Sequence, residues 1–178
     1  MAIFTKREII EALERLGQLA EAQSEMVELM LVGGALMVLA YDARQSTRDI
    51  DVVILAPREA HRVRTLAKKV AAERDWPDDW LNDAVKGYLV GLSLGPVIFS
   101  APGIEVRRPS IAQLLAMKLS AWRDDVDIAD ARRLLSELRA GRGREVVWQE
   151  VRPYLVPGYE LKAQYAFQDL WETTYGDA

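Results

Sequence analysis

Residues 26–55 read MVELMLVGGALMVLAYDARQSTRDIDVVIL. Apart from Glu28, the first seven of these residues are apolar and partly β-branched, and they stop at Gly33–Gly34, which predicts a buried strand over 26–32. A short helix of good helix formers is expected over 35–41, and a second strand over 49–55. Two strands joined through a glycine turn and a short helix predict an α/β fold around this stretch.

The rest of the chain extends this pattern into a small mixed α/β half and an all-helical half. Thr5 and Glu8 form a capping-box pattern that predicts a helix to about residue 22, and Ser110 predicts a helix start in the second half. We therefore expect two domains, 1–108 and 109–178. Further helices are expected over 57–75, 110–122, 127–139, 144–152 and 159–175, and further strands over 96–100 and 104–107.

The composition limits the possible functions. The chain has 178 residues, half of them apolar, which suits one domain or one domain with a helical extension. Lys and Arg total 23 against 27 Asp and Glu, so the net charge of −4 disfavours attachment to nucleic acid by bulk charge. Without cysteine and with a single histidine, thiol chemistry and zinc sites are excluded, and any metal must be a hard cation such as Mg²⁺ or Mn²⁺. No apolar run is long enough for a membrane span, so we expect a cytoplasmic location without a membrane partner.

Asp49 and Asp51 lie in the second predicted strand with one residue between them. Side chains alternate along a strand, so both carboxylates are expected on the same side. Two neighbouring carboxylates repel each other and are tolerated at an open edge or beside a neutralising cation. Mg²⁺ binds one or two carboxylates together with the phosphate oxygens of a substrate, so the pair predicts a metal site. A solvated sheet edge is the alternative interpretation.

Gly33 and Gly34 lack a Cβ atom, so the backbone amides at the start of the next helix could approach a phosphate closely. The alternative interpretation is an ordinary tight turn. Arg44 and Arg48 flank the acid pair in the sequence. Their planar guanidinium groups could bind phosphate, or they could neutralise the aspartates nearby.

Lys118 falls within the apolar stripe of the helix predicted after Ser110. An ammonium group in such a stripe either extends past its neighbours to water or points at an anionic group. We expect that group to be a bound triphosphate; a lysine stem that only covers apolar surface is the alternative. The stripe consists of Ile111, Leu114, Leu115 and Trp122.

The Gly-Gly turn, the short helix and the Arg-x-x-x-Arg-Asp-Ile-Asp pattern of residues 44–51 resemble the nucleotidyltransferase superfamily that includes DNA polymerase β. The closer likeness is to its minimal bacterial branch, the AbiEii-like nucleotidyltransferase toxins of toxin–antitoxin systems. This resemblance implies a small mixed-sheet core with a C-terminal helical bundle and a nucleoside triphosphate as substrate. It also implies tRNA or another RNA as acceptor and an antitoxin as protein partner. Residues 80–86, WLNDAVK, are similar to a segment of that branch and are expected to pack and to shape the cleft.

The same resemblance implies roles for residues further along the chain. A lysine in that branch contacts the nucleotide, which implies this role for Lys118. An Asp-x-x-Asp motif follows the lysine, and Asp127 and Asp130 match it, so one of them is implied in catalysis; an ordinary helix cap is the alternative. Many polymerase-β-like enzymes carry a third metal-binding carboxylate on a later strand. Glu105 is the candidate here, with a solvated strand residue as the alternative.

The expected reaction is the transfer of a nucleoside monophosphate from a nucleoside triphosphate to an acceptor hydroxyl. Asp49 and Asp51 would hold the metal, and Asp127 or Asp130 would orient or deprotonate the acceptor. Three alternatives stay open: a small-molecule nucleotidyltransferase of the aminoglycoside type, a catalytically inactive nucleotide- or protein-binding module of the same fold, and a scaffold in which Lys118 is only a packed stem.

Overall fold

The computed structural model describes residues 3–123 and 125–176. The chain forms two compact units, each of which is described by itself. The first unit contains the sheet, and the second contains the C-terminal helices together with a short segment that precedes β6. The first comprises Met1–Gly87 and Leu94–Pro109, and the second comprises Tyr88–Ser93 and Ser110–Ala178.

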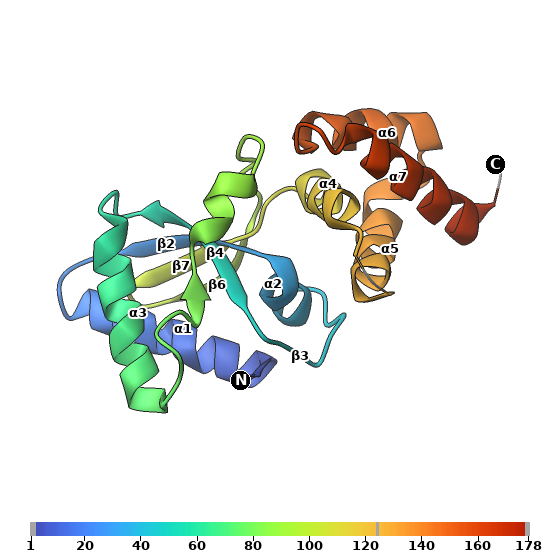
Figure 1. Ribbon diagram of the computed structural model, residues 1–178. Coiled ribbons are helices and arrows are strands. Elements are labelled where there is room, and N and C mark those ends of the chain that lie inside the picture. The colour runs from blue at the N-terminus through green and yellow to red at the C-terminus, as the bar shows by residue number, and fades with distance from the viewer. Residues whose placement is uncertain (1–2, 124, 177–178) are drawn as a thin grey trace. The chain divides into compact units, whose positions relative to one another are not determined.

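The first unit is built on a five-stranded mixed sheet in the order β5-β4-β2-β7-β6, beside a separate pairing of β1 with β3 (Figure 1). The central strand β2 is antiparallel to β4 and parallel to β7. Five of its six residues are buried, because both of its edges are paired and both of its faces are covered, and this explains its nearly continuous apolar sequence. The strands are β1 Phe4–Thr5, β2 Val27–Val32, β3 Ser46–Thr47, β4 Ile50–Ala56, β5 Leu81–Asn82, β6 Val97–Ala101 and β7 Ile104–Arg107.

Three α-helices accompany this sheet, and α1 and α3 lie side by side on the same face of it (Figure 1). The predicted capping box at the start of α1 is confirmed. The Thr5 backbone N–H donates to Glu8 Oε2 at 2.8 Å, and the Glu8 N–H donates to Thr5 Oγ1 at 3.4 Å. The helices are α1 Lys6–Glu21, α2 Gly33–Leu39 and α3 Ala60–Arg74, with a 3-10 helix η1 over Ala84–Tyr88.

Helix α1 approaches the turn between β6 and β7 so closely that a side chain has no room on either side. A Cβ on Gly17 would lie 2.5 Å from Pro102 O and 2.6 Å from Ile104 Cγ2. A Cβ on Gly103 would overlap the Gly17 carbonyl oxygen, and Gly103 also has a φ of +77°, in the left-handed region that favours glycine. The two glycines therefore set the distance between helix and sheet.

The second unit is helical, and its first helix begins as predicted. Ser110 caps α4, because its Oγ accepts a hydrogen bond from Gln113 N at 3.2 Å. The buried Gln113 side chain also accepts from Ser93 N at 2.9 Å and donates to Gly91 O at 3.1 Å, which attaches the segment Tyr88–Ser93 to this unit. The helices are α4 Ile111–Ala121, α5 Asp125–Arg139, α6 Arg144–Val151 and α7 Glu160–Tyr175, with a 3-10 helix η2 over Arg152–Tyr154.

The predicted mixed α/β fold with a helical C-terminal region is confirmed. Some local predictions were wrong. The helix predicted from Pro57 begins at Ala60, because the residues before Ala60 form a bend. Asp127 was considered as the cap of α5, but α5 begins at Asp125, and the Asp127 carboxylate is buried against Lys118. The two-residue strand β5 was not predicted.

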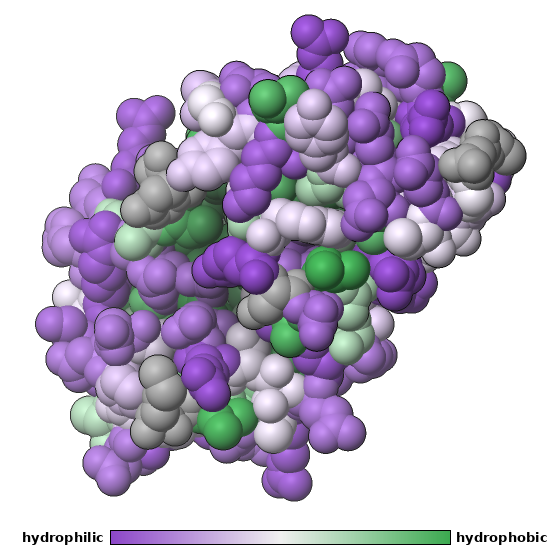
Figure 2. Space-filling view, turned by 45° about the vertical axis from the view of Figure 1, so that its right-hand side comes forward, coloured by the Kyte–Doolittle hydropathy of each residue, from purple (hydrophilic) through white to green (hydrophobic). Residues whose placement is uncertain are grey.

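Charged side chains make ion pairs on the surface of the first unit. Arg15 of α1 pairs with Glu73 of α3 at 2.7 Å, with both side chains about 40% exposed. An exposed pair of this kind adds about 1 kcal/mol or less, so the buried apolar residues carry most of the stability. Figure 2 shows a face on which hydrophilic residues predominate, with hydrophobic residues in small groups among them. No helix in the described part of the chain is long and apolar enough to cross a membrane.

Candidate active site

The turn from β2 into α2 brings the first site residues together. Gly33 follows the last residue of β2 and has a φ of +64°, a conformation that favours glycine. A Cβ on Gly33 would lie 2.9 Å from Asp51 Oδ2. Glycine is therefore favoured here by its backbone conformation, and its missing Cβ leaves room for the close approach of a carboxylate.

Asp51 is placed by strand pairing on both sides of β4. Its Cα lies opposite Val32 in the antiparallel pairing with β2 and opposite Asn82 in the parallel pairing with β5. Its side chain is partly buried, and Asn82 Nδ2 donates to Asp51 Oδ1 at 2.9 Å. One carboxylate oxygen thus faces the Asn82 amide, and the other faces Gly33.

Asp49 has a different environment from Asp51. The strand begins at Ile50, one residue later than predicted, so Asp49 precedes β4 and is exposed. Its backbone carbonyl accepts a hydrogen bond from Thr47 Oγ1 at 3.2 Å. The alternation argument applies to residues within a strand and does not fix the direction of the Asp49 side chain. The exposed carboxylate therefore stays a predicted metal ligand.

Gly34 is approached by two side chains of the segment that leads into β4. A Cβ on Gly34 would overlap Thr47 Oγ1 and would lie 3.2 Å from Arg44 Nη1. Because both glycines lack a Cβ atom, the Asp51 carboxylate lies close to Gly33. The Thr47 hydroxyl and the Arg44 guanidinium lie close to Gly34. The phosphate contact expected for the two backbone amides stays a prediction.

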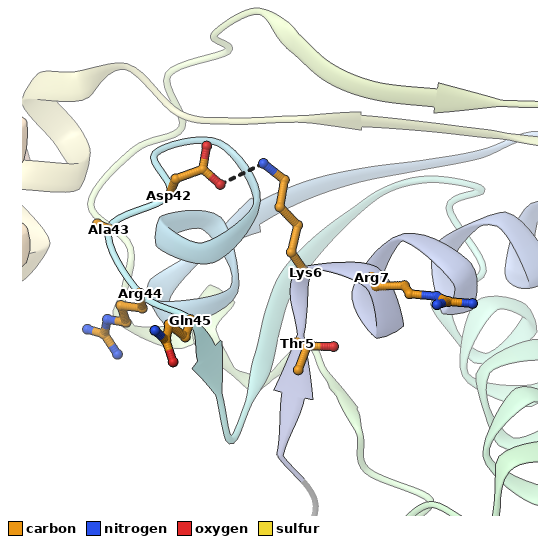
Figure 3. Close-up of a pocket in the computed structure, with 7 residues that line it drawn as sticks. All are labelled: Thr5, Lys6, Arg7, Asp42, Ala43, Arg44 and Gln45. Atoms are coloured by element: carbon orange, nitrogen blue, oxygen red, sulfur yellow. Dashed lines mark hydrogen bonds and ion pairs between the residues drawn. The ribbon is translucent and has the colours of Figure 1, made fainter.

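An open pocket of about 440 Å³ adjoins this segment in the first unit. It is lined by basic side chains, but Figure 3 shows that they extend in different directions and do not converge on one point. Lys6 reaches Asp42, with an ion pair of 2.7 Å, so the partner found for Asp42 is Lys6 (Figure 3). Arg48, the second predicted phosphate ligand, is exposed. The lining residues are Thr5, Lys6, Arg7, Asp42, Ala43, Arg44 and Gln45.

The Gly33–Gly34 turn and Asp51 form one corner of the first unit, and Glu105 does not lie in it. It lies opposite Glu28 on β2, whereas Asp51 lies opposite Val32 at the other end of the same strand. Four residues of a strand span about 13 Å, at roughly 3.3 Å per residue, which exceeds the reach of two carboxylates to one ion. Glu105 instead accepts a hydrogen bond from Arg107 Nη2 at 2.7 Å. We therefore leave Glu105 out of the candidate metal site.

The remaining oxygen donors can be compared with the needs of a divalent cation. Within residues 3–123 and 125–176, no group of three or more His, Asp or Glu side chains could hold a metal ion. Mg²⁺ binds proteins through one or two carboxylates and completes its shell with water and substrate phosphates. Asp51, with Asp49 two residues upstream, fits a cation shared with a substrate and does not fit a cation held by the protein alone.

Three predicted site residues of the second unit meet one another. Lys118 Nζ of α4 lies 2.9 Å from Asp127 Oδ1 and 2.7 Å from Asp130 Oδ2, both on α5. The lysine side chain is 12% exposed, and the two aspartate side chains are 5% and 2% exposed. The anionic partner expected for a lysine within an apolar stripe is therefore a pair of aspartates of the same unit. Lys118 is more than a packed stem, because its ammonium neutralises buried charge.

The two basic neighbours of Asp127 lower its pKa. Burial alone would raise its pKa, but the hydrogen bond and charge of Lys118, together with those of Arg123, outweigh burial and lower the pKa below its ordinary value. Arg123 Nε lies 3.2 Å from Asp127 Oδ2.

A small mixed sheet in which a Gly-Gly turn meets Asp51 of β4 agrees with the arrangement that the resemblance to nucleotidyltransferases implies. The chain belongs to the family described as nucleotidyltransferase of unknown function (DUF6036), whose model matches residues 7–138. The match covers the sheet, α4 and α5, whereas α6 and α7 lie beyond it. No curated protein and no solved structure matches the chain. The family supports nucleotidyl transfer as the general activity.

Two residues of the corner, Asn82 and Thr47, were not among the predicted site residues. Asn82 lies within the WLNDAVK segment that the sequence singled out, but its approach to Asp51 depends on the unpredicted strand β5. Thr47 directly precedes the Arg-Asp-Ile-Asp pattern, and its position beside Gly34 depends on the fold of the intervening chain. Both residues lie in or beside motifs that the sequence singled out. The sequence nevertheless does not indicate that Asn82 contacts Asp51 or that Thr47 lies beside Gly34.

Proposed function

We propose that the chain transfers a nucleoside monophosphate from a nucleoside triphosphate to an acceptor hydroxyl with the help of Mg²⁺ or Mn²⁺. The observation that supports this is the Asp51 carboxylate against Gly33, because it joins the acidic strand to the glycine turn. Asp51 and Asp49 would hold the cation. When bound, the cation neutralises phosphate charge and orients the triphosphate.

The reaction exchanges one phosphorus–oxygen bond for another. The acceptor hydroxyl oxygen forms a bond to the α-phosphorus, and the bond from that phosphorus to the oxygen bridging to the β-phosphorus breaks. Pyrophosphate leaves with the electron pair, and the hydroxyl proton is released to water. Arg44, beside Gly34, would bind a phosphate oxygen through its planar guanidinium group, and the Gly33 and Gly34 amides would donate to the triphosphate.

The roles proposed for the second unit are separate. Lys118 would contact the nucleotide, and Asp127 or Asp130 would orient the acceptor, as the AbiEii-like resemblance implies. Both carboxylates already contact the lysine ammonium, so a nucleotide phosphate would have to share that ammonium with them. For Asp127, an orienting role is preferred because its pKa is lowered.

The proposed acceptor is tRNA or another RNA, and the proposed biological role is that of a toxin restrained by an antitoxin. Both rest on the AbiEii-like resemblance. Arg44 lines one surface pocket of the first unit, and a basic side chain of this kind suits the sugar–phosphate backbone of RNA. A cationic aminoglycoside would need an acidic surface instead. Induced expression would then arrest bacterial growth, and Asp51→Ala would abolish the arrest.

The direct test is incubation with total RNA, Mg²⁺ and each of the four α-labelled nucleoside triphosphates. Wild type is expected to transfer label from at least one of them, and Asp51→Ala is expected to lose more than about a hundredfold of that rate. Asp79→Ala, at an exposed position outside the corner, is the matched control and should keep wild-type activity. Triphosphate binding without transfer would instead favour an inactive binding module, and transfer that survives in Asp51→Ala would refute the assigned metal site.

A further inference from the structure

The WLNDAVK segment, residues 80–86, lies beside the beginning of β4. Its residues Leu81 and Asn82 form β5, a strand of two residues that pairs in parallel with the beginning of β4. The pairing sets Leu81 opposite Ile50 and Asn82 opposite Asp51. A strand this short adds little to the sheet, so its main effect is to set Asn82 beside Asp51.

Both neighbours of β5 attach the segment to α3. Trp80 is 2% exposed, and its indole Nε1 donates to the Ala67 carbonyl oxygen at 2.8 Å. On the other side, the Asp83 carboxylate accepts from Arg64 Nε at 3.1 Å in a pair that involves both of its oxygens. Asn82 is therefore held between two anchored residues and does not belong to a free loop.

The Asn82 side chain uses both ends of its amide. Nδ2 donates to Asp51 Oδ1 at 2.9 Å, and Oδ1 accepts from Ala84 N at 3.1 Å. Reversing the amide would set an oxygen against the carboxylate and an N–H group against another N–H group. The two partners therefore fix which end faces Asp51.

We propose that Asn82 is a positioning residue for Asp51 in metal binding, an inference that rests on the proposed function. The hydrogen bond to Oδ1 fixes the plane of the carboxylate and turns Oδ2 toward Gly33. A neutral amide suits this task, because it orients the carboxylate without cancelling the charge that attracts a cation. A lysine at this position would compete with the cation.

The first test measures metal binding without turnover. Mn²⁺ is titrated into the full chain in the presence of a non-hydrolysable nucleoside triphosphate, because the site fits a cation shared with a substrate. Binding is followed by electron paramagnetic resonance. Asn82→Ala is expected to weaken Mn²⁺ binding by about tenfold, the lower range for loss of a residue that orients a metal ligand. Asp78→Asn is the matched control: it weakens the exposed pair with Lys68 of α3 but leaves both anchors of Asn82 and its amide on Asp51 in place, so Mn²⁺ binding should be unchanged. Equal Mn²⁺ affinity in Asn82→Ala and wild type would overturn the proposal.

A double-mutant cycle shows whether Asn82 acts through Asp51. On an Asp51→Ala background, Asn82→Ala should cause no further loss of Mn²⁺ affinity, because the carboxylate that it orients is already gone. An additional tenfold loss on that background would refute the positioning role and would make Asn82 an independent ligand.

A third measurement needs no variant to fold. The side-chain amide of Asn82 should give a pair of proton–nitrogen NMR signals in the wild type, and substoichiometric Mn²⁺ with a nucleoside triphosphate should broaden them together with other signals close to Asp51. Unaffected signals would contradict the proposal. If wild type binds Mn²⁺ but transfers no nucleotide, the proposed function alone is refuted. If wild type is active and Asn82→Ala matches it in both activity and Mn²⁺ affinity, this inference alone is refuted.

Discussion

The carboxylate of Asp51 lies against the α-carbon of Gly33, so that Oδ2 would be 2.9 Å from a Cβ built on that glycine. The two residues are 18 positions apart in the sequence, and the pairing of Val32 with Asp51 brings them together. The glycine turn and the Asp-x-Asp pattern are therefore parts of one local arrangement. A substitution at Gly33 should therefore displace the Asp51 carboxylate.

Gly33→Ala is expected to weaken Mn²⁺ binding as well as stability. An added methyl group would press on Asp51 Oδ2 and turn the carboxylate, and a φ of +64° costs a residue with a side chain about 1–2 kcal/mol. Manganese titration and urea unfolding of the same samples give both quantities. We expect at least about a tenfold loss of affinity, as for other changes that misplace a metal ligand.

The matched control for that change is Gly91→Ala. Gly91 has nearly the same conformation, with a φ of +67°, but a Cβ there would have no atom within 4 Å. It should lose a similar amount of stability, about 1–2 kcal/mol, without any change in Mn²⁺ affinity. If both variants bind Mn²⁺ like wild type, the contact between Gly33 and Asp51 has no part in metal binding.

Gly17→Ala is expected to destabilise the protein, although the same change inside a helix usually adds about 1 kcal/mol of stability. The methyl group would lie 2.5 Å from Pro102 O and 2.6 Å from Ile104 Cγ2, so α1 would have to move off the β6–β7 turn. Thermal unfolding measures the effect, for which we expect a loss of about 1–3 kcal/mol. An increase in melting temperature would show that this contact is looser than described.

Local signals accounted for much of the fold. The Thr5 and Ser110 caps are interactions within four residues of sequence, and both are present. The apolar run of β2 indicated a strand covered on both faces, which the paired central position explains. Signals of this kind depend on neighbours along the chain, so the sequence displays them directly.

The contacts of the candidate site depend on register and on distant segments, which no local pattern encodes. Glu105 is a plausible third carboxylate by its strand position, but the parallel register sets it opposite Glu28, away from Asp51. Asn82 comes beside Asp51 only through a two-residue strand, too short to give an alternation pattern. Lys118 was expected to face a bound triphosphate, which stays a prediction; the anions that it meets in the structure are Asp127 and Asp130 of the next helix.

Lys118→Met is expected to destabilise the protein by about 3–5 kcal/mol, because it removes the ammonium group that both buried carboxylates contact. Replacing all three residues, as Lys118→Met with Asp127→Leu and Asp130→Leu, should restore the free energy of unfolding to near wild type or above it. Lys69→Met, at an exposed position of α3, is the control and should change stability by no more than about 0.5 kcal/mol.

The triple variant also tests the nucleotide role proposed for Lys118. If it folds but transfers no nucleotide, the cluster acts in the reaction as well as in stability. Wild-type transfer by the folded triple variant would contradict that role and would leave the cluster as a structural link between α4 and α5.

Acid should destabilise wild type more than Asp127→Asn. The pKa of Asp127 is lowered on folding, since Lys118 and Arg123 outweigh the opposing effect of burial. A carboxyl group whose pKa is lower in the folded state stabilises the protein fully when the pH is above its pKa in the unfolded state, about 3.9 for aspartate. This contribution is lost as the pH falls through the pKa of the folded state. The difference in unfolding free energy between wild type and Asp127→Asn should therefore be constant near pH 7 and shrink below about pH 4. Urea unfolding at a series of pH values measures it, with Asp169→Asn at an exposed position of α7 as the control. A difference that stays constant down to pH 2 would mean that the Asp127 carboxylate gains nothing from its two basic neighbours.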